Sequence, residues 1–227
     1  MFTIKNIVTA AALSVVAATS ANAATISVET FSAAAYEEFA TFGDLLGQET
    51  FESYAVAEGA IAGSSVGSFV TLGGTGEGGS VIGTGTEVAV NDDTTFGRAN
   101  TTVGGANWLD SNDTLGILWT ATLGGETFNR IAFSLSDAAD QGATLSITAD
   151  GEELTTVLGR GNGEVDWVVV SFGGFVSTAD IHLINSKLND GFGIDDASIS
   201  AVPVPAAGLM LLTALGGTVA LRRRKKA

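Results

Sequence analysis

Short segments in which apolar and polar residues alternate, separated by Gly, Asn or Asp, fill the chain from Glu49 onward. They recur about every ten residues, which is the spacing of short strands joined by turns. We predict strands at residues 25–30, 49–55, 66–72, 86–90, 115–122, 127–135, 143–149, 152–158, 165–172, 179–186 and 191–200. This number and spacing predict an all-β fold, a jelly-roll-like β-sandwich of two sheets.

Three local patterns refine this prediction. Ser32 is a suitable N-cap for a short helix that carries Tyr36 and Phe39. Asp150 and Gly151 predict a tight hairpin turn, because Gly readily adopts positive φ. The glycine-rich stretch 73–85 lacks the Asp ligands of a calcium repeat and the Lys of a phosphate loop, so we interpret it as a loop.

Composition excludes several kinds of site. The chain has no cysteine, which rules out disulfides, thiol nucleophiles and cysteine-ligated zinc. Residues 24–201 contain 25 acidic and four basic residues, a net charge of −21. Such a negative field repels phosphate backbones, so nucleic acid is not an expected partner.

The first 23 residues have the pattern of a secretory signal peptide. Lys5 precedes an apolar run at residues 7–18, and Ala21 and Ala23 form the small-x-small cleavage site. The apolar run is shorter than the roughly 20 residues that a transmembrane helix needs. We therefore expect signal peptidase to cut after Ala23 and to leave one β-sandwich domain at residues 24–201.

Residues 202–227 read as a C-terminal sorting signal. A short motif comes first, made of Val202, Pro203, Val204, Pro205 and Ala206. An apolar run of sixteen residues, Ala206 to Leu221, follows, and as a helix it would be about 24 Å long. Its largest apolar residues and the first basic residues after it are Leu209, Leu211, Leu212, Leu215, Leu221, Arg222, Arg223 and Arg224. We expect a transmembrane helix with a cytoplasmic basic end, which places the β domain outside.

Together, the signal peptide, exported domain, proline motif, apolar helix and basic end resemble the PEP-CTERM family of bacterial exported proteins. The motif is similar to the Val-Pro-Leu-Pro-Ala variant, with Val204 at the third position. The resemblance implies processing by an exosortase, a membrane enzyme that would remove the helix. It also implies an inner-membrane precursor in a Gram-negative bacterium, followed by a cell-surface or matrix location. Residues 50–54 and 190–196 are similar to segments of other domains in this family.

One group of acids is a candidate metal site. Glu52 lies early in the domain and Asp190, Asp195 and Asp196 lie at its end. If the first and last strands are neighbours, these carboxylates meet at one edge and bind a structural Ca²⁺, which needs six to eight oxygen ligands. The alternative is that they are ordinary exposed acids beside a turn.

A second acidic segment, 110–114, resembles half of a calcium loop. It lacks the Gly and the closing Glu of an EF-hand, so we predict an Asx-turn instead. Asp110 or Asp113, paired with another acid, is also the basis of a further alternative, a hydrolase.

The tryptophans are the residue type that stacks on sugar rings. Trp108 adjoins a polar loop and is the candidate for exposed stacking on a polysaccharide, whereas Trp119 and Trp167 have core-like neighbours. The one histidine, His182, is expected on the solvated face of a strand. The sequence thus favours a non-enzymatic exported surface or matrix protein, with a Ca²⁺-dependent polysaccharide-binding module as the alternative.

Overall fold

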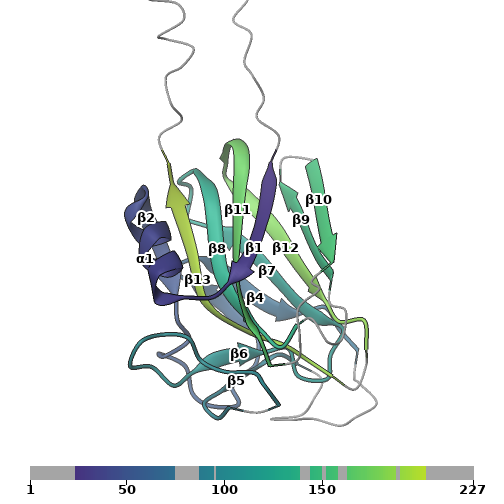
Figure 1. The fold of residues 1–227 in the computed structure, drawn as a ribbon. Helices are drawn as coiled ribbons and strands as arrows, with labels where there is room; N and C mark the ends of the chain where they lie inside the picture. The colour runs from purple at the N-terminus through teal and green to yellow at the C-terminus, as the bar shows by residue number, and fades with distance from the viewer. Residues whose placement is uncertain are drawn as a thin grey trace, which may run out of the picture. The chain divides into compact units, whose positions relative to one another are not determined.

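Two antiparallel sheets pack face to face in the computed structural model (Figure 1). It describes residues 24–74, 87–94, 96–138, 144–149, 152–157, 163–187 and 190–202. The seven-stranded sheet contains β1 (Thr25–Thr30), β2 (Asp44–Glu49), β5 (Ala89–Asn91), β6 (Trp108–Asp110), β8 (Phe128–Ser136), β11 (Val165–Val176) and β13 (Gly193–Ala201). The six-stranded sheet contains β3 (Ile61–Ser64), β4 (Gly67–Thr71), β7 (Gly116–Thr122), β9 (Thr144–Ala149), β10 (Glu152–Val157) and β12 (Thr178–Ile184).

The strand order brings distant segments together. The larger sheet runs β1-β11-β8-β13-β6-β5, with β2 also paired to β13, and the smaller runs β10-β9-β12-β7-β4-β3. The two-sheet β-sandwich predicted from the sequence is therefore confirmed.

Alternation along the strands builds the core between the sheets. In β12, for example, Ile181 and Leu183 are buried while His182 lies on the opposite face and is partly exposed. An aromatic chain crosses this core: Phe69 lies edge-on to Phe51 and stacks on Trp119, with ring centroids 5.3 Å apart in the stack. The predicted exposure of His182 and the burial of its neighbours are both confirmed.

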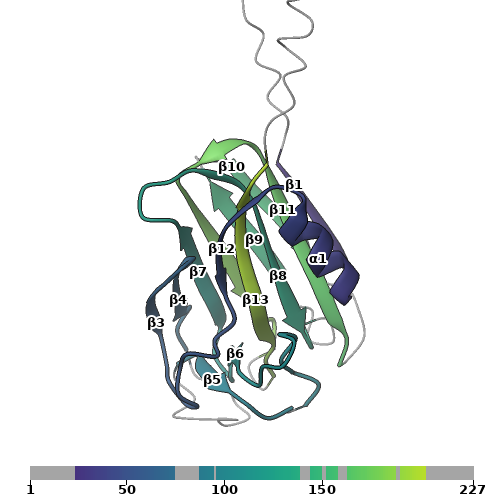
Figure 2. The same cartoon turned by 90° about the vertical axis from the view of Figure 1, so that its left-hand side faces the viewer.

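The single helix among the described residues, α1 (Ala33–Thr41), covers part of the outer face of the seven-stranded sheet (Figure 2). Ser32 caps it as predicted, since its side chain accepts a hydrogen bond from the Ala35 N–H at 3.1 Å. Phe39 packs edge-on against Trp167 of β11, with centroids 5.9 Å apart. This contact gives the apolar side of the helix a buried partner.

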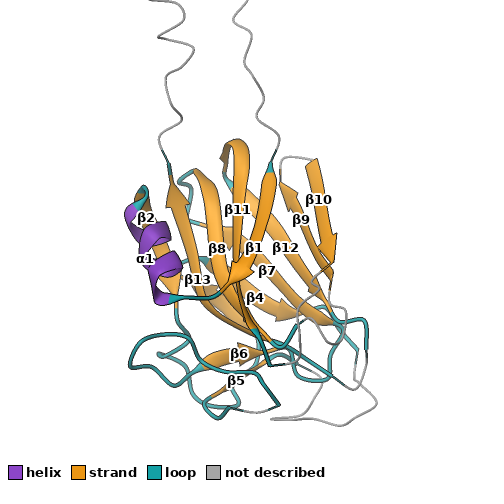
Figure 3. Ribbon diagram, in the orientation of Figure 1, coloured by secondary structure: helices purple, strands orange, loops and turns teal. Residues whose placement is uncertain are grey.

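One row of residues crosses the sheet where β1 begins and β13 ends. Thr25 pairs with Ser171, Ser171 with Arg130, Arg130 with Ser200, and Ser200 with Leu45. We call this the near end of the sandwich and the opposite end the far end. Both ends of the described chain, residues 24 and 202, therefore lie at the near end, whereas most of the longer loops gather at the far end (Figure 3).

Several predicted elements shift. The predicted strand 49–55 is wrong, because β2 ends at Glu49 and a turn follows in which Phe51 has positive φ (58°) and its N–H bonds to the Glu49 side chain. The short strands β3 and β6 were not predicted. Strand β10 pairs with β9 in the register expected for a two-residue hairpin, Glu152 opposite Ala149.

Some predictions fall outside the described residues. They are the signal peptide, most of the glycine-rich stretch, the turn at 150–151, and everything after Val202. Within the described ranges, no helix is long and apolar enough to cross a membrane.

Candidate functional site

A β-bulge in β13 brings two successive carboxylates to the outer face of the seven-stranded sheet. Asp195 pairs with Ser134, the register then shifts, and Ser198 pairs with Ala132. Asp196 occupies the extra position with a positive φ of 50°. Because the bulge breaks the alternation, Asp195 and Asp196 both reach the same loop instead of facing opposite ways.

Residues 96–107 form that loop, which we call the 96–107 loop. The Asp195 Oδ2 atom accepts hydrogen bonds from the N–H groups of Thr101 (2.8 Å) and Thr102 (3.1 Å). The Asp196 carboxylate accepts from the hydroxyls of the same two threonines, at 2.8 and 2.9 Å. Two acids of the last strand thus hold the loop against the sheet.

Glu52 holds the other side of the loop. Its Oε1 atom accepts from the N–H groups of Ala106 and Asn107, both at 2.9 Å. The side-chain amide of Asn100 joins the two sets of acids, since its Nδ2 atom lies 3.0 Å from Glu52 Oε1 and 3.2 Å from Asp195 Oδ2. The predicted convergence of Glu52, Asp195 and Asp196 therefore occurs around this loop.

The route to this convergence differs from the one predicted from the sequence. The first strand, β1, pairs with β11, and it is β2 that lies beside the last strand, β13. Asp190 does not join the group, because its carboxylate faces Arg98 at 3.5 Å. Within the described ranges no group of three or more His, Cys, Asp or Glu side chains is arranged to hold a metal ion. A structural Ca²⁺ bound by these four acids stays a prediction from the sequence.

The adjacent acids perturb one another. Burial, together with the charge of Asp196, raises the pKa of Asp195 to about 7, although hydrogen bonds from the N–H groups of Thr101, Asp196 and Thr102 lower it. Burial also raises the pKa of Asp196, while hydrogen bonds from Thr101, Thr102 and Gln48 lower it. Near neutral pH the Asp195 carboxyl is therefore a group that exchanges a proton within the fold.

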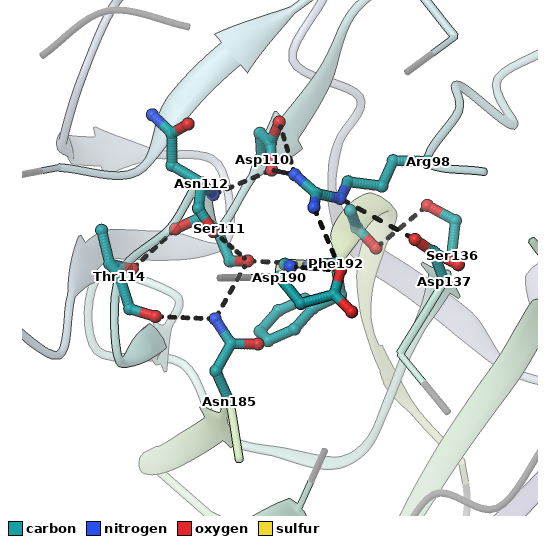
Figure 4. A network of polar contacts seen from close by, with 12 residues as sticks. Arg98, Asp110, Ser111, Asn112, Thr114, Ser136, Asp137, Asn185, Asp190 and Phe192 are labelled. Atoms are coloured by element: carbon teal, nitrogen blue, oxygen red, sulfur yellow. Dashed lines mark hydrogen bonds and ion pairs between the residues drawn. The ribbon is translucent and has the colours of Figure 1, made fainter. Parts of the chain in front are cut away.

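Arg98, in the same loop, forms a buried ionic centre (Figure 4). Its guanidinium nitrogens lie 3.0 Å from Asp110, 3.5 Å from Asp190 and 4.0 Å from Asp137. Burial raises the pKa of Asp110 and outweighs the opposing charge of Arg98 and the hydrogen bonds that lower it. One cation therefore compensates several acids that come from separate parts of the chain.

Segment 110–114 closes this centre as an ordered turn. The Asn112 N–H donates to Asp110 Oδ1 at 2.8 Å, which confirms the predicted Asx-turn. The Thr114 hydroxyl donates to the Ser111 carbonyl, and the Asn185 amide donates to the Thr114 carbonyl at 2.8 Å. Asp110 is fully buried, so the acid proposed for a hydrolase is engaged with Arg98 and away from solvent.

Trp108 is buried and not exposed. It has 0% exposure, so the prediction of an exposed stacking residue is wrong. The reason is that β6 is a strand covered on both faces, and Trp108 packs on Gly193, where an added Cβ would lie 2.6 Å from the indole ring. Trp119 and Trp167 are buried, as predicted.

The outer face of the six-stranded sheet carries polar side chains in register. The pairings align two rows across the strands: Glu153, Thr148, Asp180, Thr120 and Ser68, and beside them Thr155, Ser146, His182, Leu118 and Val70. All ten side chains are partly or fully exposed. Thr120 donates to Asp180 at 2.8 Å, and Ser146 donates to Glu153 at 2.9 Å. This surface offers hydroxyl and carboxyl groups and the His182 imidazole, but no Phe, Tyr or Trp ring in either row.

Sequence reasoning missed Arg98 and the threonine pair of the 96–107 loop. Arg98 is one of only four basic residues between 24 and 201. A basic residue among so many acids is a candidate for a buried ion pair, and this could have drawn attention to it. No sequence pattern marks Thr101 and Thr102, because their partners lie 94 and 93 residues away.

Comparisons with known proteins give only distant similarity. No protein-family model and no curated protein matches the chain. Among solved structures it is similar to the CBM22-1 xylan-binding domain of Paenibacillus barcinonensis Xyn10C, with a TM-score of 0.39 and 14% identity over 73% of this chain and 99% of that one. The CBM22-1-CBM22-2 tandem domain of the same protein gives a TM-score of 0.40 and 15% identity, covering 73% of this chain and 47% of that one. Similarity at this level does not identify a ligand or a reaction for this chain.

Proposed function

We propose that this chain is an exported, non-enzymatic cell-surface or matrix protein whose jelly-roll-like domain is delivered by its C-terminal tail. The tail sequence carries the proposal: a Val-Pro-Val-Pro-Ala motif at 202–206, a sixteen-residue apolar run and a basic end, in a chain that begins with a signal-peptide pattern. Signal peptidase and an exosortase-type enzyme are the processing partners. The precursor is held in the inner membrane until the tail is cut.

The position of the chain ends supports this proposal. Residues 24 and 202 both lie at the near end, so both processing steps act on the same end of the domain and leave the far end free. The Asn129 side chain binds Val202 through two hydrogen bonds, from the Val202 N–H at 2.8 Å and to the Val202 carbonyl at 2.9 Å. The folded domain therefore extends to the first residue of the motif.

The state of the acids supports a non-enzymatic role. A hydrolase of the paired-carboxylate type needs two carboxyl groups that face a substrate, whereas Asp110 is bound to Arg98 and Asp113 is 4% exposed. Glu52 Oε1 and Asp195 Oδ2 accept hydrogen bonds from the 96–107 loop. The acids in these contacts fix the domain's own loops.

Localisation of a truncated chain tests the proposal. Removing residues 203–227 should release the domain from the membrane and surface fractions of an exosortase-bearing host into the soluble fraction. A matched variant, Val204→Leu, restores the more usual motif and should be sorted like the original. Identical fractionation of the truncated and full-length chains would contradict delivery by the tail.

Binding of a polysaccharide is a second candidate function, and the outer face of the six-stranded sheet favours it. Its aligned hydroxyl and carboxyl groups match the hydrogen-bonding groups of a neutral sugar chain. Binding should be measured on an array of matrix polysaccharides, with and without a Ca²⁺ chelator. The variant Thr148→Ala with His182→Ala should lose binding, while Ser27→Ala on the outer face of β1 should keep it. An array without signal in either condition would count against this candidate.

A further inference from the structure

Three large apolar side chains are exposed at the near end. Phe42, which follows α1, is 60% exposed, Leu45 in β2 is 40% exposed, and Phe175, one residue before the end of β11, is 46% exposed. Leu45 lies in the near-end row beside Ser200. Phe175 also lies at this end, because its neighbour Val176 pairs with Phe128, the first residue of β8, two residues before Arg130 of the near-end row. All three side chains lie at the end of the sandwich at which the described chain leaves the domain.

A basic residue accompanies them. Arg130 is in the same row, and its guanidinium lies 4.5 Å from the Phe39 ring centroid and 5.3 Å from that of Phe42. It is one of four basic residues between 24 and 201. Acids lie here as well, since the charge of Glu38 acts on Arg130 and the exposed Asp44 pairs with Ala201. The near end thus combines exposed rings with one basic side chain among acids, so its contact with a lipid headgroup layer depends on the exposed apolar side chains.

The acids of the 96–107 loop lie at the other end of β13. Asp195 and Asp196 are the third and fourth residues of this nine-residue strand and Ala201 is its last, so about 17 to 20 Å separates the two acids from Ala201 at 3.3 Å per residue. That distance is about two Debye lengths, each about 8 Å at physiological salt. These two carboxyl groups therefore lie well away from a membrane that touches the near end.

The length of chain between the domain and the apolar run limits how far apart they lie. Three residues, 203–205, separate Val202 from Ala206, the first residue of the run. Four fully extended steps cover about 14 Å at most. Once the run is in a bilayer, as the proposed function requires, the near end lies within the reach of the headgroup layer.

We propose that in the tail-anchored precursor the near end rests on the lipid bilayer, with Phe42, Leu45 and Phe175 in contact with the headgroup layer. This inference rests on the proposed anchoring by the tail. It assigns a lipid surface to the end of the sandwich at which the described chain leaves the domain. The far end also exposes apolar side chains, among them Phe96 and Val103, but the tail does not start there. The far end then points away from the membrane.

Site-specific labelling of the full chain tests the contact, because the protein has no native cysteine. Phe42→Cys and Phe175→Cys carry an environment-sensitive fluorophore, and Val103→Cys in the 96–107 loop, where Val103 is 92% exposed, is the far-end control. All three positions are exposed, so the labels do not disturb the core. The proteins are reconstituted in vesicles of phosphatidylethanolamine and phosphatidylglycerol that contain a headgroup-attached quencher.

The expected result is that the quencher lowers the fluorescence of the labels at positions 42 and 175. The fluorescence of the label at position 103 should not change. Flotation of the vesicles, measured on the same samples, reports anchoring separately. Flotation with equal, weak quenching at all three positions would overturn the lipid contact, leaving a membrane protein as the occupant of the near end, and would leave the anchoring intact. Failure to float would contradict the anchoring itself and, with it, the contact.

Discussion

The pH dependence of folding should reveal the state of Asp195. Burial, reinforced by the neighbouring charge of Asp196, raises the pKa of the folded-state carboxyl to about 7, from an ordinary value of 3.8. Between these two values the folded protein holds a proton that the unfolded chain has released. The stabilisation is fully present below the unfolded pKa and is lost as pH rises through 7, so the protein should be more stable in mild acid.

The size of the effect follows from the same values. The free energy of unfolding should fall by about 1.4 kcal/mol per pH unit while the folded carboxyl stays protonated. Between pH 5 and pH 8 this gives a loss of about 3 kcal/mol from Asp195 alone, an upper value because relaxation of the fold reduces it. Burial also raises the pKa of Asp196 and of Asp110, so they add to the trend with the same sign.

Asp195→Asn isolates this contribution. The Asn oxygen keeps an acceptor for the threonine N–H groups, but its amide faces the Asp196 N–H, which lies 2.7 Å from Asp195 Oδ1. The variant should therefore lose about 1–3 kcal/mol at pH 5 and show a flatter pH dependence. Urea unfolding at pH 5 to 8, followed by the fluorescence of the buried tryptophans, measures both. A slope as steep as that of the original protein would refute this reasoning, and Asp44→Asn on the exposed start of β2 is the matched control.

Two further substitutions test the ionic centre and the close contact of β7 with β12. Arg98→Met should lower the free energy of unfolding by about 3–5 kcal/mol, because it leaves Asp110 buried without its cation. Adding Asp110→Asn should recover part of this loss. Urea unfolding midpoints measure both effects, and an unchanged midpoint in the single variant would contradict the buried ion pair. Gly116→Ala should cost about 3 kcal/mol or more, since Gly116 has a φ of +129° and an added Cβ would overlap the Leu183 carbonyl oxygen. Gly174→Ala, where a Cβ meets nothing within 4 Å, should change the melting temperature little, and equal losses in the two glycine variants would rule out the steric explanation.

Most of the fold follows from alternation and turn residues, and the exceptions have physical causes. Strand β1 and the cap at Ser32 match the prediction, because both depend on local pattern. Strand β2, whose sequence is Asp-Leu-Leu-Gly-Gln-Glu, does not alternate and forms because β13 offers it a partner. Strand β6 was missed because it is three residues long and buried on both faces.

The candidate site was predictable only in part. The acids at 52, 195 and 196 could be named from the sequence because carboxylates are the usual ligands of a hard cation. The pairing of β2 with β13 brings them together. Their partners were not predictable, because a bulge at Asp196 decides which way two adjacent carboxylates point. The burial of Trp108 likewise depends on the close approach of Gly193, a contact between segments 85 residues apart.

The most direct test of delivery by the tail is the intact mass of the protein recovered from its exosortase-bearing host. The account predicts a mass that lacks both ends, with a new N-terminus at Ala24 and a C-terminus near Pro205, and therefore without the five terminal basic residues. A mass that retains the chain through Ala227 would contradict the proposal that the tail is a removable sorting signal.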